Sequence, residues 1–379
     1  MALNTIPNPG LTKRGFPTAR VANPLVINGD MAVSQRGTSF TSNGYSLDRY
    51  TIDESTDGAI TVTQDTDVPS GYGFGKSLKV DCTTADASIG AAQYCIFTSK
   101  LEGQNLQLLK YGTSSAENVT LSFWVKSVKT GTYCMSFVKE AGSGTRYECP
   151  IEYTISSAST WEKKVINLSP TAGSTSLITA ANGAIVNSNA SGFRIIWTLV
   201  SGSNFHATNN TWVAGSDKLA TSNQVNFLDS TSNNFWITGV QLNVGEFNST
   251  TLPAFAFESF GDNLERCLRY YYRANGRCGF GAGTGFVQDG AVKGYIYHTM
   301  PVPPRTEMSF SLSDTSGGII TIDGNASDTV TSISATHSDS FPYKDYEFNF
   351  VTNGSSVTDK CGMGVRINAS NYIEGSAEL

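Results

Sequence analysis

Residues 27–40 and 45–50 concentrate charge in a chain that carries little of it. Their sequences are INGDMAVSQRGTSF and YSLDRY, and together they hold two acids and two arginines, Asp30, Arg36, Asp48 and Arg49. Carboxylates beside arginines occur in active sites and metal sites, but also in ion pairs that hold a fold together. The rest of the sequence must decide between these roles.

No histidine and no pair of nucleophile and base accompanies these four residues, so a catalytic role is not predicted. Asp30 and Asp48 could supply carboxylates to a calcium site. Pairing with the arginines is the favoured interpretation, because buried charges are tolerated when they are paired. We therefore predict that Asp30, Arg36, Asp48 and Arg49 form a partly buried ion-pair cluster that pins the first strand to its domain.

The remaining sequence carries no recognisable catalytic or cofactor motif. G-x-S-x-G, P-loop, H-E-x-x-H and dinucleotide fingerprints are all missing from it. The seven cysteines show no C-x-x-C spacing, so they are predicted to be buried small hydrophobic residues rather than metal ligands. We predict a protein that is not an enzyme and uses neither cofactor nor metal. A facing pair of glycosidase carboxylates among the 32 acidic residues stays open.

Aromatic residues in polar loops are the better candidates for binding. Aromatic rings stack on the apolar faces of sugars, while amides and carboxylates bond the hydroxyl groups. The candidates are Tyr72, Phe205 and Trp212, although core packing and solvent exposure are equally open for Trp212. Three further tryptophans lie within predicted strands and are expected in the core: Trp124, Trp197 and Trp236.

Composition limits the partners of the protein. The 379 residues carry a net charge of −6, and the scattered Lys and Arg residues predict no nucleic-acid partner. No apolar run has the length needed to cross a membrane. The polar N-terminus is unlike a secretory signal peptide, so synthesis in a cytoplasm is expected.

Alternating apolar and polar residues dominate the chain and predict an all-β fold. About eight short strands over residues 25–258 favour a jelly-roll β-sandwich. A helical stripe follows in residues 259–274, with Asp262 or Asn263 as its predicted N-cap. Residues 275–379 then predict a smaller antiparallel β-domain, while the Pro-containing residues 1–24 are interpreted as an anchoring arm.

Three segments together resemble a family of bacteriophage virion proteins. They are NPLVINGDMAVSQRGTSF with YSLDRY, WITGVQLNVGEFNSTTLPAFAFESFGDNLERCLRYYYR, and the terminal YIEGSAEL. The resemblance implies a jelly roll like that of carbohydrate-binding modules, a location in the virion, and assembly into homo-oligomers, commonly trimers. It also implies, in many members, a host surface polysaccharide as ligand. Contact with other virion proteins through residues 1–24 is expected separately, from the interpretation of that segment as an anchoring arm.

The favoured hypothesis is thus a non-enzymatic structural component of a phage virion, such as a tail fibre, made in the host cytoplasm. It would dock by the arm and present its β-domains to host surface glycans. Two alternatives remain. One is a capsid-decorating head-fibre, knob or cement-like protein without a specific receptor, and the other is a polysaccharide depolymerase.

Overall fold

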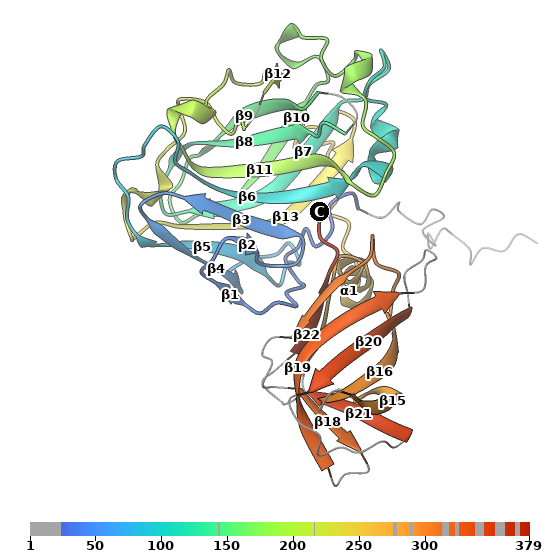
Figure 1. Ribbon diagram of the computed structural model, residues 1–379. Coiled ribbons are helices and arrows are strands. Elements are labelled where there is room, and N and C mark those ends of the chain that lie inside the picture. Colours follow the sequence, from blue (N-terminus) through green and yellow to red (C-terminus); the bar gives the residue numbers. More distant parts are fainter. Residues whose placement is uncertain are drawn as a thin grey trace, which may run out of the picture.

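The computed structural model describes residues 24–379 except 143–144, 216, 276–278, 289–290, 313–317, 323–325, 338–344, 353–360 and 368–371. The predicted arm therefore lies outside the described residues, apart from Pro24. The described chain forms a β-sandwich followed by a helix and a smaller β-domain (Figure 1).

Two antiparallel sheets make up the sandwich (Figure 1). The six-stranded sheet contains, in spatial order, β1 (Ser39–Phe40), β4 (Ala59–Asp65), β5 (Ser77–Thr84), β13 (Asn234–Val244), β7 (Val119–Ser127) and β10 (Glu162–Leu168). The seven-stranded sheet contains β12 (Val213–Ala214), β9 (Tyr147–Ile155), β8 (Gly131–Lys139), β11 (Ser191–Ser201), β6 (Tyr94–Glu102), β3 (Tyr50–Ser55) and β2 (Gly44–Tyr45). Short 3-10 helices in the connections span Gly103–Leu109, Ala172–Ser174, Ala181–Gly183, Ser203–Phe205 and Phe227–Asp229.

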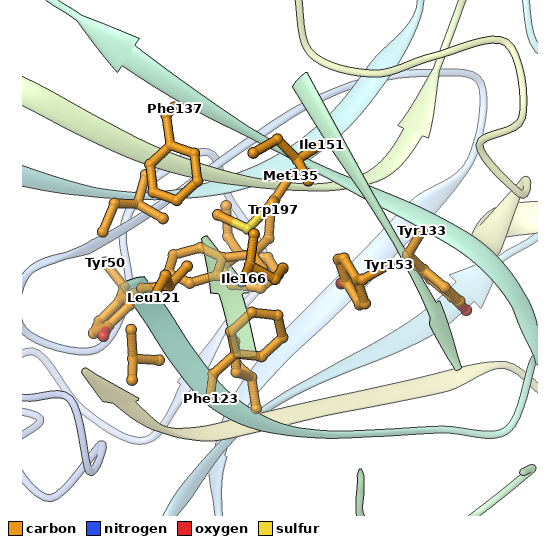
Figure 2. Close-up of a cluster of buried hydrophobic side chains, with 14 of the residues drawn as sticks. Tyr50, Leu121, Phe123, Tyr133, Met135, Phe137, Ile151, Tyr153, Ile166 and Trp197 are labelled. Atoms are coloured by element: carbon orange, nitrogen blue, oxygen red, sulfur yellow. The ribbon is translucent and has the colours of Figure 1, made fainter. Parts of the chain in front are cut away.

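The hydrophobic core fills the space between the two sheets (Figure 2). Side chains alternate along each strand, so every second residue of β7 enters the core, among them the fully buried Leu121 and Phe123. Trp197 of β11 stacks on Phe97 of β6 with the ring centroids 5.1 Å apart. The expectation that Trp197 is a core residue is thus confirmed. The cysteines whose side chains are described are buried and unpaired, as predicted, whereas those of Cys278 and Cys361 lie outside the described side chains.

Helix α1 (Phe260–Leu268) follows the sandwich and lies where the two β-domains meet (Figure 1). The hydroxyl of Ser259 accepts a hydrogen bond from the backbone N–H of Asp262 at 3.1 Å, so Ser259 is the N-cap. The predicted caps, Asp262 and Asn263, are wrong because the helix starts one turn earlier than its apolar stripe. No helix among the described residues is long and apolar enough to span a membrane.

The C-terminal part consists of a small sheet and a closed barrel. The sheet contains β14 (Tyr271–Asn275), β22 (Tyr372–Ser376) and β17 (Ser309–Leu312) in that order. The barrel contains β15 (Gly279–Gln288), β16 (Ala291–Thr299), β20 (Asp345–Thr352), β19 (Ala326–His337), β18 (Gly318–Ile322) and β21 (Cys361–Ile367). The predicted fold class, a jelly-roll sandwich with a short helix and a smaller antiparallel β-domain, is confirmed.

Candidate functional site

Large aromatic side chains gather on the outer surface of the six-stranded sheet. Trp236 of β13, Trp124 of β7 and Trp161, immediately before β10, are half-buried although each is large and largely apolar. Tyr72, in the loop between β4 and β5, is 55% exposed, and its ring centroid lies 4.3 Å from that of Trp124. We call these four residues the aromatic face.

Strand alternation places these tryptophans outside the core. Phe235 and Ile237, on either side of Trp236, are fully buried between the sheets, so Trp236 must project to the other side. The ladder pairs Trp236 with Lys79 of β5 and with Lys126 of β7. A row of alternating lysine and tryptophan therefore crosses the sheet and ends at Trp161.

The lysines of this row lie against the aromatic rings and are matched by carboxylates. The Nζ atom of Lys126 lies 4.1 Å from the ring centroid of Trp236 and 5.5 Å from that of Trp161, and it forms an ion pair with Asp67. Lys79 pairs with Asp81 at 2.8 Å and lies 5.4 Å from the Trp236 ring. Such contacts combine cation–π attraction with ion pairing.

Two aspartates at the start of the β4–β5 loop fix the indole rings. Trp236 Nε1 donates to Asp65 at 3.1 Å, and Trp161 Nε1 donates to Asp67 at 3.0 Å. Partial burial raises the pKa of Asp65, but hydrogen bonds from Trp236 and two backbone N–H groups, with the charge of Lys79, outweigh it and hold the pKa below its ordinary value. Asp65 thus stays ionised and keeps its indole partner at neutral pH. Rings held in one orientation lose little freedom when a ligand binds.

One glycine allows the aromatic packing at the end of this face. Gly239 of β13 has a φ of +64°, and a Cβ atom there would lie 2.6 Å from Phe74 Cζ and 3.1 Å from Trp124 Cδ1. The pairing of β13 with β7 shifts register between Thr238 and Gln241, at the same place. A side chain at residue 239 would therefore clash with Phe74 and press on the edge of Trp124.

The arrangement suits a sugar chain better than a reaction. The half-buried indole rings and the exposed phenol ring can stack on sugar C–H groups, and the Asp67 side chain, 43% exposed, can accept hydrogen bonds from hydroxyls. Lys126 is nearly buried between two indoles, so it positions rings more than it meets solvent. Within the described part of the chain, no three His, Cys, Asp or Glu residues are grouped so as to hold a metal ion.

The predicted binding residues lie in different places. Tyr72 belongs to the aromatic face. Phe205 packs edge-on against Tyr94 at 5.2 Å, beside the seven-stranded sheet. Of the two alternatives left open for Trp212, core packing is the correct one and the binding role is wrong, because its side chain is 1% exposed and its Nε1 donates to the carbonyl of Ser169 at 2.9 Å. Trp212 is a core residue that offers no ring to a ligand.

The expectation that Trp124 and Trp236 are core residues is also wrong. Each tryptophan lies two positions from polar residues of its own strand, which places it on the same face of the sheet as they are. Trp124 lies between Ser122 and Lys126, and Trp236 precedes Thr238. Counting parity along these strands would have placed both rings outside. Trp161, just ahead of a strand, carried no comparable pattern and was missed.

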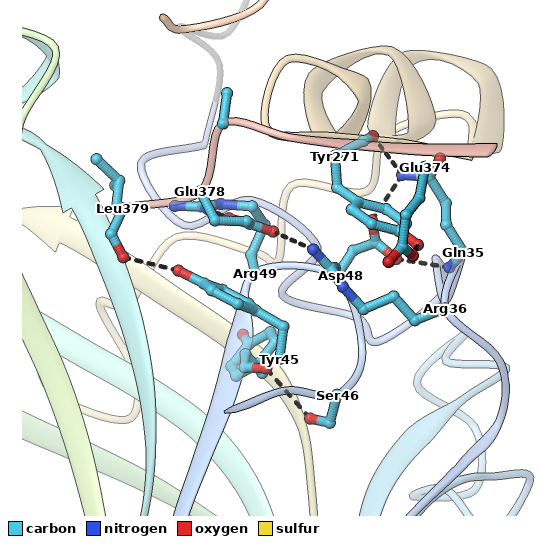
Figure 3. Close-up of polar contacts among 12 residues, drawn as sticks. Gln35, Arg36, Tyr45, Ser46, Asp48, Arg49, Tyr271, Glu374, Glu378 and Leu379 are labelled. Carbon is cyan, nitrogen blue, oxygen red and sulfur yellow. Dashed lines mark hydrogen bonds and ion pairs between the residues drawn. The ribbon is translucent and has the colours of Figure 1, made fainter. Parts of the chain in front are cut away.

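Figure 3 shows Arg36, Asp48 and Arg49 close together, but the predicted pairing of these arginines with Asp30 and Asp48 is wrong. Arg36 Nη2 lies 3.2 Å from Glu378 Oε1, and Arg49 pairs with the other oxygen of Glu378. Their guanidinium groups also lie 3.5 Å from the ring centroids of Tyr271 and Tyr270, respectively. We call Arg36, Arg49, Tyr270, Tyr271 and Glu378 the junction cluster.

Neither aspartate forms an ion pair within the described residues. Asp48 instead accepts hydrogen bonds from the backbone N–H of Gln35 at 2.7 Å and from its side-chain amide at 2.6 Å. Asp30 accepts one from the Asn263 amide at 3.0 Å. Burial raises the pKa of both carboxyls. The carboxylate that balances the arginines comes instead from the last residues of the chain, which no local spacing could indicate.

The junction cluster joins the sandwich to the C-terminal segment. Arg49 is 2% exposed and the Glu378 side chain 5%, so no ligand can reach the ion pair. Burial alone lowers the pKa of Arg49, but Glu378 and neighbouring groups raise it above its ordinary value, and the arginine stays charged. Beside the cluster, Tyr45 donates to the backbone oxygen of Leu379 at 2.8 Å (Figure 3). The cluster is structural rather than catalytic.

Comparisons with known proteins give distant structural neighbours. No protein-family model and no curated protein matches the sequence. One similar solved structure is the enzymatically active domain of tailspike protein 4 from bacteriophage CBA120, at 15% identity and a TM-score of 0.29. The match covers 52% of this chain but only 19% of that one.

Carbohydrate-binding modules from Clostridium thermocellum are also similar. A family 11 module in complex with a beta-1,3-1,4-mixed-linked tetrasaccharide is 11% identical with a TM-score of 0.27, covering 56% of this chain and 98% of that one. The C-terminal family 22 module of Xyn10B is 15% identical with a TM-score of 0.29, covering 58% and 99%. Since all three TM-scores lie below 0.5, we argue function from the residues of the aromatic face.

Proposed function

We propose that this protein is a non-enzymatic, glycan-binding component of a phage virion, such as a tail fibre. The observation that carries the glycan part is the aromatic face, where three indoles and a phenol remain accessible on a sheet whose other side is fully packed. Aromatic groups at a surface are otherwise expected to be covered. The virion part is supported by the resemblance of the sequence to phage appendage proteins.

The charges of the face favour a neutral glycan over a strongly anionic one. Lys79 is paired with Asp81, and Lys126 with Asp67, so neither lysine offers an unbalanced charge. An acidic sugar would have to displace a carboxylate already in place, whereas hydroxyl groups can bond to the paired groups as they stand. Within this proposal the protein is a homo-oligomer, with trimers suggested by the resemblance, and residues 1–24 attach it to other virion proteins.

The test is binding of the purified protein to polysaccharides from host cell surfaces, compared with Trp236→Ala. Removing this central ring should lower affinity by roughly 30-fold, the effect of losing about 2 kcal/mol at an aromatic hot spot. Phe205→Ala is the matched control, because Phe205 packs beside the other sheet. Equal binding by both variants and the unaltered protein would contradict the assignment of the face.

The same samples test the non-enzymatic part of the proposal. Incubation with a bound polysaccharide should leave its viscosity and its number of reducing ends unchanged. New reducing ends would identify a depolymerase instead. Absence of binding to every host polysaccharide, by a correctly assembled protein, would favour a decorating protein without a receptor.

A further inference from the structure

A pocket of about 860 Å³ lies beside helix α1 and the C-terminal end of β13, whereas Trp236 lies near the start of that strand. Its apolar walls include Leu25, Ile27 and Leu242, together with Leu108, which is 48% exposed. Cavities of about 300–1,000 Å³ with apolar walls are the usual form of a binding site in proteins. We therefore expect a ligand or a protein segment to fill this pocket.

The pocket adjoins the point where the described chain begins. Pro24 lines it, and the carbonyl of Pro24 accepts a hydrogen bond from Arg266 Nη2 at 2.5 Å. The other end of that guanidinium pairs with Glu258 at 2.6 Å. Arg266 thus fixes the position from which residues 1–23 depart, at the rim of the pocket.

Residues 1–23 include apolar side chains that suit the pocket, and their net charge is opposite to that of the rest of the chain. Their apolar side chains include Leu11, Phe16 and Val21. They carry Lys13, Arg14 and Arg20 but no acid, a charge of +3, whereas the remaining residues hold 23 basic and 32 acidic side chains, a net charge of −9. Opposite net charge favours association of such a segment with the body of another copy, while the charged residues that line the pocket, Arg266 and Arg269, are already paired with Glu258 and Glu102.

We propose that residues 11–23 of one copy occupy this pocket in a second copy of the chain. Pro24 favours extended backbone at the residue before it, and Pro17 fixes its own φ angle, and both preferences suit an arm that reaches a neighbouring copy. Twenty-three residues can span up to about 75 Å, enough to reach a neighbour. Exchange of a terminal segment is a low-cost route to oligomers.

Such an exchange is heterologous, since an arm on one copy meets a pocket on the next, and it closes into a ring when the rotation permits. This inference rests on the proposed function, which includes assembly into a homo-oligomer, and it names the contact that would hold the copies together. Residues 1–10 would remain for attachment to other virion proteins. The aromatic face takes no part in the contact, so glycan binding and assembly can fail separately.

The experiment compares the mass in solution of the full chain with two full-length variants. Phe16→Asp/Val21→Asp alters the arm, and Leu108→Glu blocks the pocket at an exposed residue where folding is not at risk. Each variant should sediment as a single chain of 40.5 kDa, while the unaltered protein is an oligomer. Val186→Glu, at an exposed apolar residue elsewhere, is the matched control and should stay oligomeric.

Mixing the two variants is the decisive step. The arm variant retains an intact pocket and the pocket variant an intact arm, so the mixture should form a one-to-one complex that neither forms alone. A monomeric unaltered protein, an oligomer formed by either variant alone, or no complex in the mixture would overturn the proposal. Glycan affinity per chain should be the same for all samples. Loss of affinity in the two variants alone would show that glycan binding depends on assembly and would overturn their independence, whereas no binding by the unaltered oligomer would count against the aromatic face instead.

Discussion

The junction cluster and the aromatic face use the same chemistry in opposite surroundings. In each, a cation lies over aromatic rings and pairs with a carboxylate, Arg49 over Tyr270 with Glu378, and Lys126 over Trp236 with Asp67. The first carboxylate has a side chain only 5% exposed, while that of Asp67 is 43% exposed. The same set of groups therefore occurs in both places, and burial of the carboxylate distinguishes the structural junction from the face that we propose binds glycan.

The choice of cation fits the difference. The flat guanidinium of an arginine can stack on a ring and still bond a carboxylate, and it holds its charge when buried. Lysine offers a flexible point charge, better suited to a site where water and ligand compete. The ion pair at the junction joins Arg49 to Glu378, 329 positions later in the sequence. The aromatic face is instead built on strands that are paired within one sheet.

The largest expected effect on stability comes from removing the buried carboxylate of the junction cluster. Glu378→Gln leaves Arg36 and Arg49 without their carboxylate in a buried place, and it should lower the free energy of unfolding by about 3–5 kcal/mol. Urea unfolding followed by tryptophan fluorescence would measure it. Glu246→Gln, at an exposed residue, is the control. A loss no greater than that of the control would mean that the junction does not hold the two parts together.

The equivalent change on the face should cost far less stability. Asp67→Asn takes the carboxylate from Lys126, whose side chain is only 9% exposed, but solvent reaches position 67, so the free energy of unfolding should fall by about 1–2 kcal/mol, less than for Glu378→Gln. Glycan affinity should fall several-fold, since Trp161 and Lys126 lose the group that positions them. Titration calorimetry with the bound polysaccharide gives the affinity. A stability loss equal to that of Glu378→Gln would erase the distinction between the two clusters.

The sequence predicted the fold better than the sites, and the residues show why. Alternation in a segment such as residues 118–127 is local, so strands, sandwich and helix could be predicted from it. To predict the aromatic face, the alternation must be followed residue by residue. Trp124 and Trp236 occupy the polar, outward-facing positions of strands that are otherwise largely apolar. Glu378 was beyond reach, because its partnership with Arg49 depends on how the chain returns after an entire barrel.

Smaller, but informative in sign, is the dependence of stability on pH at Asp48, which lies beside the junction. Burial raises the pKa of this carboxyl above its ordinary value near 3.9. Between the two values the folded protein binds more protons than the unfolded chain, so the unfolding free energy should fall as pH rises through the raised pKa. Asp48→Asn should abolish this component of the slope in urea unfolding curves measured between about pH 3 and pH 7. An identical slope in the variant would show that Asp48 does not carry it.

Asp65, on the aromatic face, should contribute a slope of the opposite sign and the smallest size. Its pKa lies below the ordinary value, so its contribution to stability is fully present above about pH 3.9 and is lost as pH falls through the lowered pKa. Asp65→Asn should therefore flatten the acid end of the curve and leave the region changed by Asp48→Asn untouched. Glycan binding should persist in mild acid, because the carboxylate that holds Trp236 stays ionised there. If Asp48→Asn and Asp65→Asn changed the pH slope of the unfolding free energy in the same direction, the two carboxyls would not have pKa values shifted in opposite directions. The comparison between the buried junction and the open aromatic face would then fail for these two groups.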